Sequence, residues 1–351
     1  MCASAVCRIA DFSVSIERKH KNTASSLNDE SYDQHDTGKK AMMTANIPFL
    51  SRAIQYLENA FIYLAVRGGQ MAQKLSAIRC FNGTQYIFSH ASSELKCLMK
   101  FGIYIPDLQV DEKVPVLYYL SGLTCTEANF IEKSGFQRAA SAMKVIVVNP
   151  DTSPRGESIP DDPESWDFGK GAGFYVDAVE PKWCSNYRMY SYIRDELPRL
   201  ITTTFKECDP QRQGIFGHSM GGHGAIVIGL RNPQTFRTIS AFAPICNPMQ
   251  CQWGKKAFRG YLGEDEEKWK AYDSVELLNS YTGPERRILV DQGTLDKFLI
   301  EGQLLSKNLE AVKSDKVKLE LRYQDGYDHS YFFIATFIED HIRFHKEILT
   351  H

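Results

Sequence analysis

The stretch Gly217-His218-Ser219-Met220-Gly221 constrains the fold of this chain more than any other feature. A short apolar run at 213–216 precedes it, and a run rich in small residues at 221–230 follows it. Strand, sharp turn and helix are the context of a nucleophile elbow, in which the serine backbone is strained and flanking Cβ atoms would collide. Glycine removes those atoms. The pattern predicts Ser219 as a catalytic nucleophile, and an ordinary glycine-rich turn is the alternative.

Composition narrows the classes of partner. The 351 residues carry a net charge of -2, which gives no electrostatic attraction to nucleic acid or to an anionic membrane. No apolar run approaches the roughly 20 residues of a membrane span. Nine scattered cysteines without CxxC pairs are typical of free thiols in the cytoplasm. Small molecules are therefore the expected partners. No phosphate-binding loop, dinucleotide-binding motif or metal-ligand cluster is found, so we expect neither cofactor nor metal.

The chain divides by texture near residue 70. Residues 19–40 are strongly polar, and 47–66 have apolar residues at helical spacing, so we expect 1–70 to be a poorly ordered extension with one amphipathic helix. Residues 71–351 form the predicted catalytic domain. Its expected strands and helices alternate, which predicts a mostly parallel sheet flanked by helices with an antiparallel pair at its start. The expected strands are 85–89, 97–105, 114–120, 144–148, 213–216, 238–242, 287–290 and 317–323, and the expected helices are 190–205, 221–230, 300–313 and 331–349. Residues 247–279 are expected to form a cap over the strand ends.

A serine nucleophile requires a histidine base and usually a carboxylate that orients it. His329 follows the last expected strand and precedes the last expected helix, which is where such a histidine belongs. His341 and His345 fall inside that helix, where we expect a solvated face. The loop after strand 287–290 offers Asp291 and Asp296, and we favour Asp296 because it lies beyond Gly293 at a helix start.

Acyl transfer also requires donors for an oxyanion. In this architecture one is the backbone N–H after the nucleophile, here Met220, and the other comes from a loop after an early strand, for which we nominate Leu123. Cys125 in the same loop could be a reactive thiol or a small buried side chain. Arg155, Lys255 and Lys256 are candidates for attracting an anionic substrate, although such residues are often only solvated.

Several long stretches carry a family resemblance. They read SGLTCTEANF from Ser121, DTSPRG from Asp151, SWDFGKGAGFYVDA from Ser165, GHSMGGHGA from Gly217 and GYDHSYFFIATF from Gly326. With these motifs, about four fifths of the chain resembles the S-formylglutathione hydrolase family, also called esterase D. The N-terminal 70 residues lie outside the resemblance.

The resemblance implies an α/β-hydrolase fold and hydrolysis of S-formylglutathione to formate and glutathione, the last step of glutathione-dependent formaldehyde removal, with side activity on small carboxylesters. It implies Ser219 as nucleophile, His329 as base, Asp296 as acid, and Leu123 and Met220 as the oxyanion hole. Family members are generally cytosolic and often dimeric, so a homodimer is an expected state. The alternatives are a general carboxylesterase or thioesterase of other acyl specificity, and a non-catalytic binding protein.

Overall fold

A central sheet organises the protein, for which a computed structural model describes residues 72–350. The predictions for 1–70 lie outside these residues and stay predictions. Within the described part, nine strands pair in the order β1-β2-β3-β5-β4-β6-β7-β8-β9. Strands β1 to β3 pair antiparallel, as do β3 and β5, and every pairing from β5 through β4 to β9 is parallel. The strands are β1 Gln73–Arg79, β2 Gly83–Ala91, β3 Leu98–Pro106, β4 Val114–Leu120, β5 Ile146–Pro150, β6 Cys208–His218, β7 Thr238–Phe242, β8 Arg286–Gly293 and β9 Val317–Gln324.

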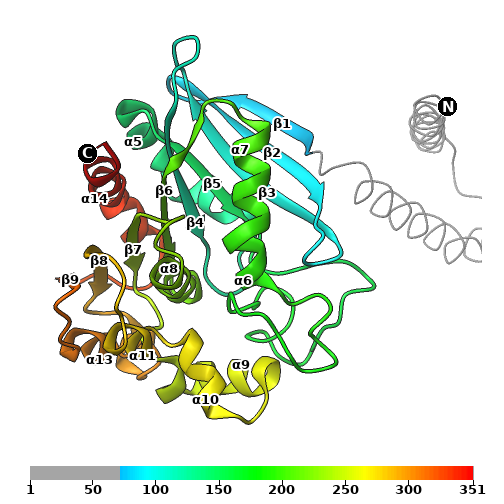
Figure 1. Cartoon of the computed structure of the whole chain (residues 1–351), viewed down its shortest axis with the longest axis vertical. Coiled ribbons are helices and arrows are strands. Elements are labelled where there is room, and N and C mark those ends of the chain that lie inside the picture. Colours follow the sequence, from blue (N-terminus) through cyan, green and yellow to red (C-terminus); the bar gives the residue numbers. More distant parts are fainter. Residues whose placement is uncertain (1–71, 351) are drawn as a thin grey trace, which may run out of the picture. The chain divides into compact units, whose positions relative to one another are not determined.

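Helices cover both faces of the sheet. Figure 1 shows α5 Phe136–Met143 and α14 Tyr331–Thr350 on one face, with α7 Leu197–Thr204 and α8 Met220–Arg231 on the other. Every residue of β4, β5 and β7 is consequently buried, as expected for parallel strands covered on two sides. This is the α/β-hydrolase arrangement that the sequence predicts. The carboxyl ends of the parallel strands remain available for a site.

The segment between β7 and β8 is mostly helical. It contains a 3₁₀ turn at Pro248–Gln250, α9 Gln252–Leu262, α10 Glu266–Trp269, a second 3₁₀ turn at Lys270–Tyr272 and α11 Ser274–Asn279. Trp269 and Tyr261 are buried in its packing. The remaining helices are α4 Glu127–Lys133, α6 Met189–Ser191 with the π-turn Tyr192–Glu196, α12 Lys297–Ile300 and α13 Ser306–Ala311.

One expected helix is wrong. The pattern at 300–313 predicts a continuous helix, but α12 ends at Ile300 and α13 begins only at Ser306. Gly302 and Leu305 both have positive φ angles, 71° and 52°, and residues in this left-handed region cannot continue a right-handed helix. The break leaves α12 as a short element directly after Asp296.

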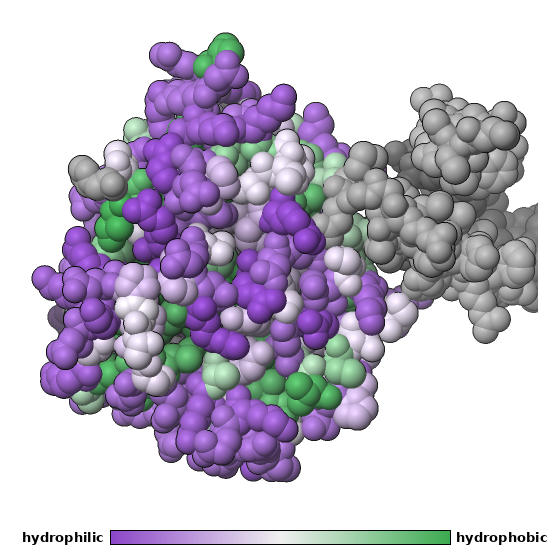
Figure 2. All heavy atoms as spheres, in the orientation of Figure 1, coloured by the Kyte–Doolittle hydropathy of each residue, from purple (hydrophilic) through white to green (hydrophobic). Residues whose placement is uncertain are grey.

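The described surface is mostly hydrophilic. On the face drawn in Figure 2, apolar residues form only small, separate groups. Among residues 72–350, no helix combines the length and apolarity that crossing a membrane requires. The cysteines of this part, Cys80, Cys97, Cys125, Cys184, Cys208, Cys246 and Cys251, are free thiols, as expected.

Candidate active site

Ser219 lies in a sharp turn between a central strand and a helix. β6 ends at His218 and α8 begins at Met220, so Ser219 alone makes the turn, with φ 58° and ψ -120°. A positive φ is strained for a residue with a side chain and persists only where the surroundings enforce it. A Cβ on Gly221 would lie 2.0 Å from the carbonyl oxygen of Leu120, so this position requires glycine. The backbone therefore has the form of the nucleophile elbow that the sequence predicts.

His329 and Asp296 are brought together by two neighbouring loops. Asp296 follows β8, His329 follows β9, and these strands pair side by side. His329 Nδ1 lies 2.5 Å from Oδ2 of the fully buried Asp296. A carboxylate can only accept, so Nδ1 carries the hydrogen and Nε2 is left with its lone pair. Asp296 is itself held by the backbone N–H of Phe298 at 2.9 Å and by Gln292 Nε2 at 3.2 Å.

Asp291, the less favoured carboxylate, serves a different network. Arg322 donates two hydrogen bonds to it, of 2.7 and 2.6 Å, and His341 Nε2 lies 3.1 Å from its Oδ2. Burial raises the pKa of Asp291, but the bonds from His341 and Arg322 outweigh burial and hold the pKa at about 2. Asp291 therefore stays charged and is held by Arg322, Gln324 and His341.

The expectation of a solvated face for His341 and His345 is wrong. Both side chains are fully buried. α14 lies against β7, where the hydroxyls of Ser240 and Thr238 face it: Ser240 Oγ is 2.8 Å from both His341 Nδ1 and His345 Nε2, and Thr238 Oγ1 is 2.6 Å from His345 Nδ1. These hydroxyl partners satisfy polar rings that would otherwise be costly to bury.

A second histidine lies beside His329. The rings of His218 and His329 are 4.3 Å apart. Burial lowers the pKa of His218 well below its ordinary value, and the neighbouring His329 adds to this effect. His218 is consequently neutral near pH 7.

The loop after β4 supplies the nominated oxyanion donor. Gly122 lies against the nucleophile, since a Cβ there would be 3.1 Å from Ser219 Cβ. The following N–H groups of Thr124 and Cys125 donate to Gly171 and Gly122 oxygens. Within residues 72–350, no hydrogen-bond acceptor is found for the N–H of Leu123 or of Met220. Both are therefore available for a ligand.

Ser219 and His329 line the same cavity, of about 250 Å³. Its lining is mainly apolar and consists of Gly122, Leu123, Thr124, Cys125, Trp166, His218, Ser219, Trp253, Phe298, His329, Ser330 and Tyr331. Burial raises the pKa of the Cys125 thiol, so little thiolate forms near neutral pH. The aromatic members were not singled out as site residues in the sequence, because their spacing along the chain carries no periodic signal.

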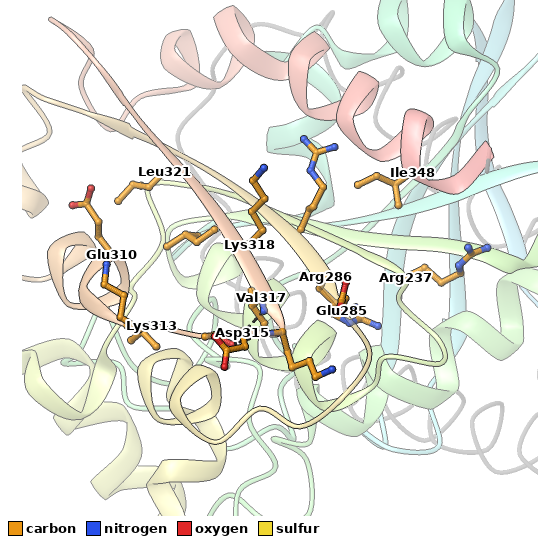
Figure 3. Close-up of a pocket in the computed structure, with 15 residues that line it drawn as sticks. Arg237, Glu285, Arg286, Glu310, Lys313, Asp315, Val317, Lys318, Leu321 and Ile348 are labelled. Atoms are coloured by element: carbon orange, nitrogen blue, oxygen red, sulfur yellow. Dashed lines mark hydrogen bonds between the residues drawn. The ribbon is translucent and has the colours of Figure 1, made fainter.

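Larger cavities lie elsewhere in the described residues. The one in Figure 3, of about 790 Å³, is lined by charged side chains such as Arg237, Glu310 and Lys318, mostly around the starts of β8 and β9. It contains none of the predicted site residues. The described residues also contain no group of three or more His, Cys, Asp or Glu side chains arranged to hold a metal ion.

The nominated basic residues are mostly engaged within the protein. Arg155 Nε donates to Asp151 at 2.8 Å and its Nη2 donates to the Cys125 carbonyl at 3.2 Å. Lys256 Nζ pairs with Asp167 at 2.5 Å. Two of the three candidate charges are thereby held by internal partners.

Comparison with known proteins shows the family to which the chain belongs. Residues 92–344 match the family described as "Putative esterase". The chain is 58% identical to S-formylglutathione hydrolase of Mus musculus over 278 residues, which covers 79% of this chain and 98% of the mouse protein. It is 50% identical to the Arabidopsis thaliana protein of the same name, over 80% of this chain and 99% of that one. A solved S-formylglutathione hydrolase from Agrobacterium tumefaciens superposes with a TM-score of 0.76 at 48% identity, over 79% of this chain and 99% of that one.

Proposed function

This chain belongs to the S-formylglutathione hydrolases of the esterase family, and we propose that it hydrolyses S-formylglutathione to formate and glutathione by an acyl-enzyme mechanism. The observation that carries the proposal is the hydrogen bond between His329 Nδ1 and Asp296, at the wall of the cavity that Ser219 also lines. This bond leaves His329 Nε2 as the proton acceptor, which is the tautomer that nucleophilic serine catalysis requires.

In the first half-reaction, Ser219 Oγ attacks the formyl carbon while His329 Nε2 takes the hydroxyl proton. The carbonyl oxygen becomes an oxyanion, which the N–H groups of Leu123 and Met220 stabilise by hydrogen bonds. The carbon–sulfur bond then breaks and glutathione leaves, taking the proton from His329 as it becomes a thiol. Ser219 carries the formyl ester.

In the second half-reaction, water gives a proton to His329 Nε2 and attacks the formyl ester. Collapse of the new tetrahedral intermediate releases formate and returns the proton to Ser219 Oγ. Throughout, Asp296 holds the ring of His329 and stabilises the imidazolium that forms. The neutral His218 adds no competing positive charge near that ring.

A general carboxylesterase or thioesterase with the same residues is the competing function. A cavity of about 250 Å³ is small for an enzyme pocket and favours a short acyl group. Measuring kcat/KM for S-formylglutathione, S-acetylglutathione and longer acyl thioesters separates the two functions. We expect a steep decline with acyl length. A preference for longer acyl chains would refute the formyl specificity.

We place this activity in the cytoplasm, because free cysteines persist there and the described cysteines form no disulfide. The proposed substrate is a small molecule, and small carboxylesters are proposed as side substrates. A homodimer is the proposed assembly, and light scattering of the purified protein measures its mass directly.

A further inference from the structure

The cavity beside Ser219 cannot enclose a tripeptide thioester. Pockets that bury a drug-sized ligand measure roughly 300–1,000 Å³. The cavity here has about 250 Å³. If the formyl end sits at Ser219, the peptide half of the leaving thiol must extend outward over the residues at the cavity mouth.

A continuous row of aromatic rings leads from His329 outward. Phe298 meets the His329 ring edge-on, with centroids 4.8 Å apart. Trp253 follows at 4.7 Å from Phe298, and Trp166 lies edge-on to Trp253 at 5.7 Å. Trp166 is 59% exposed, so the described residues leave most of this large apolar side chain uncovered. A side chain of this kind at the mouth of a pocket is suited to cover a ligand.

The loop that carries Trp166 is fastened in place. Lys256 of α9 bonds to Ser165 Oγ at 3.2 Å and pairs with Asp167, the two residues on either side of Trp166. α9 also carries Trp253. Lys256 thus holds the loop against α9 and keeps Trp166 beside Trp253.

Lys297 places a positive charge on the same row of rings. Its Nζ lies 4.6 Å from the centroid of Phe298. Because the Phe298 and His329 centroids are 4.8 Å apart, the ammonium lies no farther from the His329 centroid than 4.6 Å and 4.8 Å added together. Lys297 is exposed, and among residues 72–350 no carboxylate forms an ion pair with it. Lys133 makes a similar but longer contact with another ring at the cavity, since its Nζ lies 5.9 Å from the centroid of Tyr331.

These distances match the dimensions of the leaving thiol. Each residue of an extended chain spans at most about 3.6 Å, so a terminal carboxylate of a tripeptide thiol lies on the order of 7 Å from the central cysteine backbone. A sulfur held next to His329 can thus be joined to a carboxylate held at Lys297.

We propose that Trp166, Phe298 and Lys297 form a subsite for the peptide half of an anionic thiol, in which Trp166 covers the peptide and Lys297 pairs with a carboxylate. This inference rests on the proposed function, since it takes the substrate to be a glutathione thioester. It assigns recognition of the thiol to the cavity rim and recognition of the acyl group to the cavity itself.

Binding of S-methylglutathione to the wild-type enzyme tests the subsite without turnover, because a thioether has no acyl group to transfer. Isothermal titration calorimetry at low ionic strength should show Kd raised about threefold to fivefold by Lys297→Met and by a similar factor by Trp166→Ala. Lys297→Arg, which keeps the charge, should restore most of the affinity. Lys318→Met removes another exposed lysine, at the separate cavity of Figure 3, and should leave Kd unchanged.

Added salt gives a second readout. Because Lys297 is exposed, the difference in Kd between wild type and Lys297→Met should shrink as ionic strength rises, whereas the effect of Trp166→Ala should persist. Absence of S-methylglutathione binding, or a Kd that neither substitution changes, overturns the subsite.

Turnover of S-formylglutathione judges the proposed function separately. If the wild type turns over S-formylglutathione but neither Lys297→Met nor Trp166→Ala changes the Kd for S-methylglutathione, only the subsite is refuted. Binding that depends on both residues, without turnover of S-formylglutathione, supports the subsite and refutes the proposed reaction.

Discussion

Replacing each of the two carboxylates after strand β8 by its amide should separate catalysis from stability. Asp291 and Asp296 are five positions apart in one chain segment, and both are fully buried. Asp296 bonds to His329, whereas Asp291 pairs with Arg322 and His341. We predict that Asp296→Asn abolishes most turnover in a folded protein, and that Asp291→Asn lowers stability in a protein that still turns over substrate.

The magnitude for Asp291 follows from its pKa. The fall from 3.8 to about 2, at roughly 1.4 kcal/mol for each pH unit, corresponds to about 2 kcal/mol of stability from the charged carboxylate. Because the folded-state pKa is depressed, this stability is fully present above about pH 4 and is lost as the pH falls through 2. Asp291→Asn should therefore cost about 2–4 kcal/mol at pH 7, the upper end reflecting the unpaired Arg322 and His341.

The magnitude for Asp296 follows from the tautomer of His329. An asparagine amide has a single acceptor oxygen, so it can accept from only one of the His329 and Phe298 N–H groups, and its NH₂ would face the other. The His329 ring then loses the partner that keeps hydrogen on Nδ1, and kcat should fall about 10⁴-fold, the scale seen when this interaction is lost in serine proteases.

Urea unfolding at pH 7 and pre-steady-state kinetics with an aryl ester measure the two effects on each variant. The difference in unfolding free energy between wild type and Asp291→Asn should also narrow between pH 4 and pH 2. The separate roles of the two carboxylates are wrong if Asp291→Asn lowers kcat as much as Asp296→Asn does, or if Asp291→Asn leaves stability unchanged.

Three further perturbations have defined outcomes. Burial lowers the pKa of His223 to about 4, so the stability that goes with its neutral form is complete above about pH 6.5 and is lost toward pH 4. His223→Gln should therefore reduce the slope of unfolding free energy against pH by about 1.4 kcal/mol per pH unit between these values. An unchanged slope in urea titrations would contradict this. Gly221→Ala should prevent folding or lower the free energy of unfolding by more than about 3 kcal/mol, because its Cβ would lie 2.0 Å from the Leu120 carbonyl oxygen. Gly302→Ala, at a residue with φ 71° and open space around it, should lower the free energy of unfolding by only about 1–2 kcal/mol in thermal unfolding. Gly122→Ala should lower kcat by about 10- to 100-fold and change the melting temperature little, because its Cβ would lie 3.1 Å from Ser219 Cβ. A large loss of stability with a normal kcat would argue against the placement of this loop.

Local patterns with a direct backbone cause were predictable from the sequence. The glycines around Ser219 predict the strained turn, and the strand at 114–120 is recovered to the residue as β4. β1 was missed, because six of its seven residues are exposed and its sequence QKLSAIR lacks the alternation of a half-buried strand. It forms only because β2 offers a free edge for pairing.

Features that depend on tertiary contacts were not predictable. The burial of His341 and His345 requires hydroxyls on β7, about a hundred residues earlier in the chain. The preference for Asp296 over Asp291 was a prediction from loop geometry. Arg322 and His341 bind Asp291 in a separate network, and spacing along the chain alone could not identify them as its partners. Trp166 lies in a loop and Phe298 in α12, more than a hundred residues apart in the chain, and no local pattern predicts that both line the same cavity.

The most direct test of the account is the hydrolysis of S-formylglutathione by the purified chain, with formate and free thiol quantified together. We expect equal amounts of formate and glutathione, a kcat/KM well above that for S-acetylglutathione, and loss of turnover in Ser219→Ala. Undiminished hydrolysis by Ser219→Ala, or no release of formate by the wild type, would contradict it.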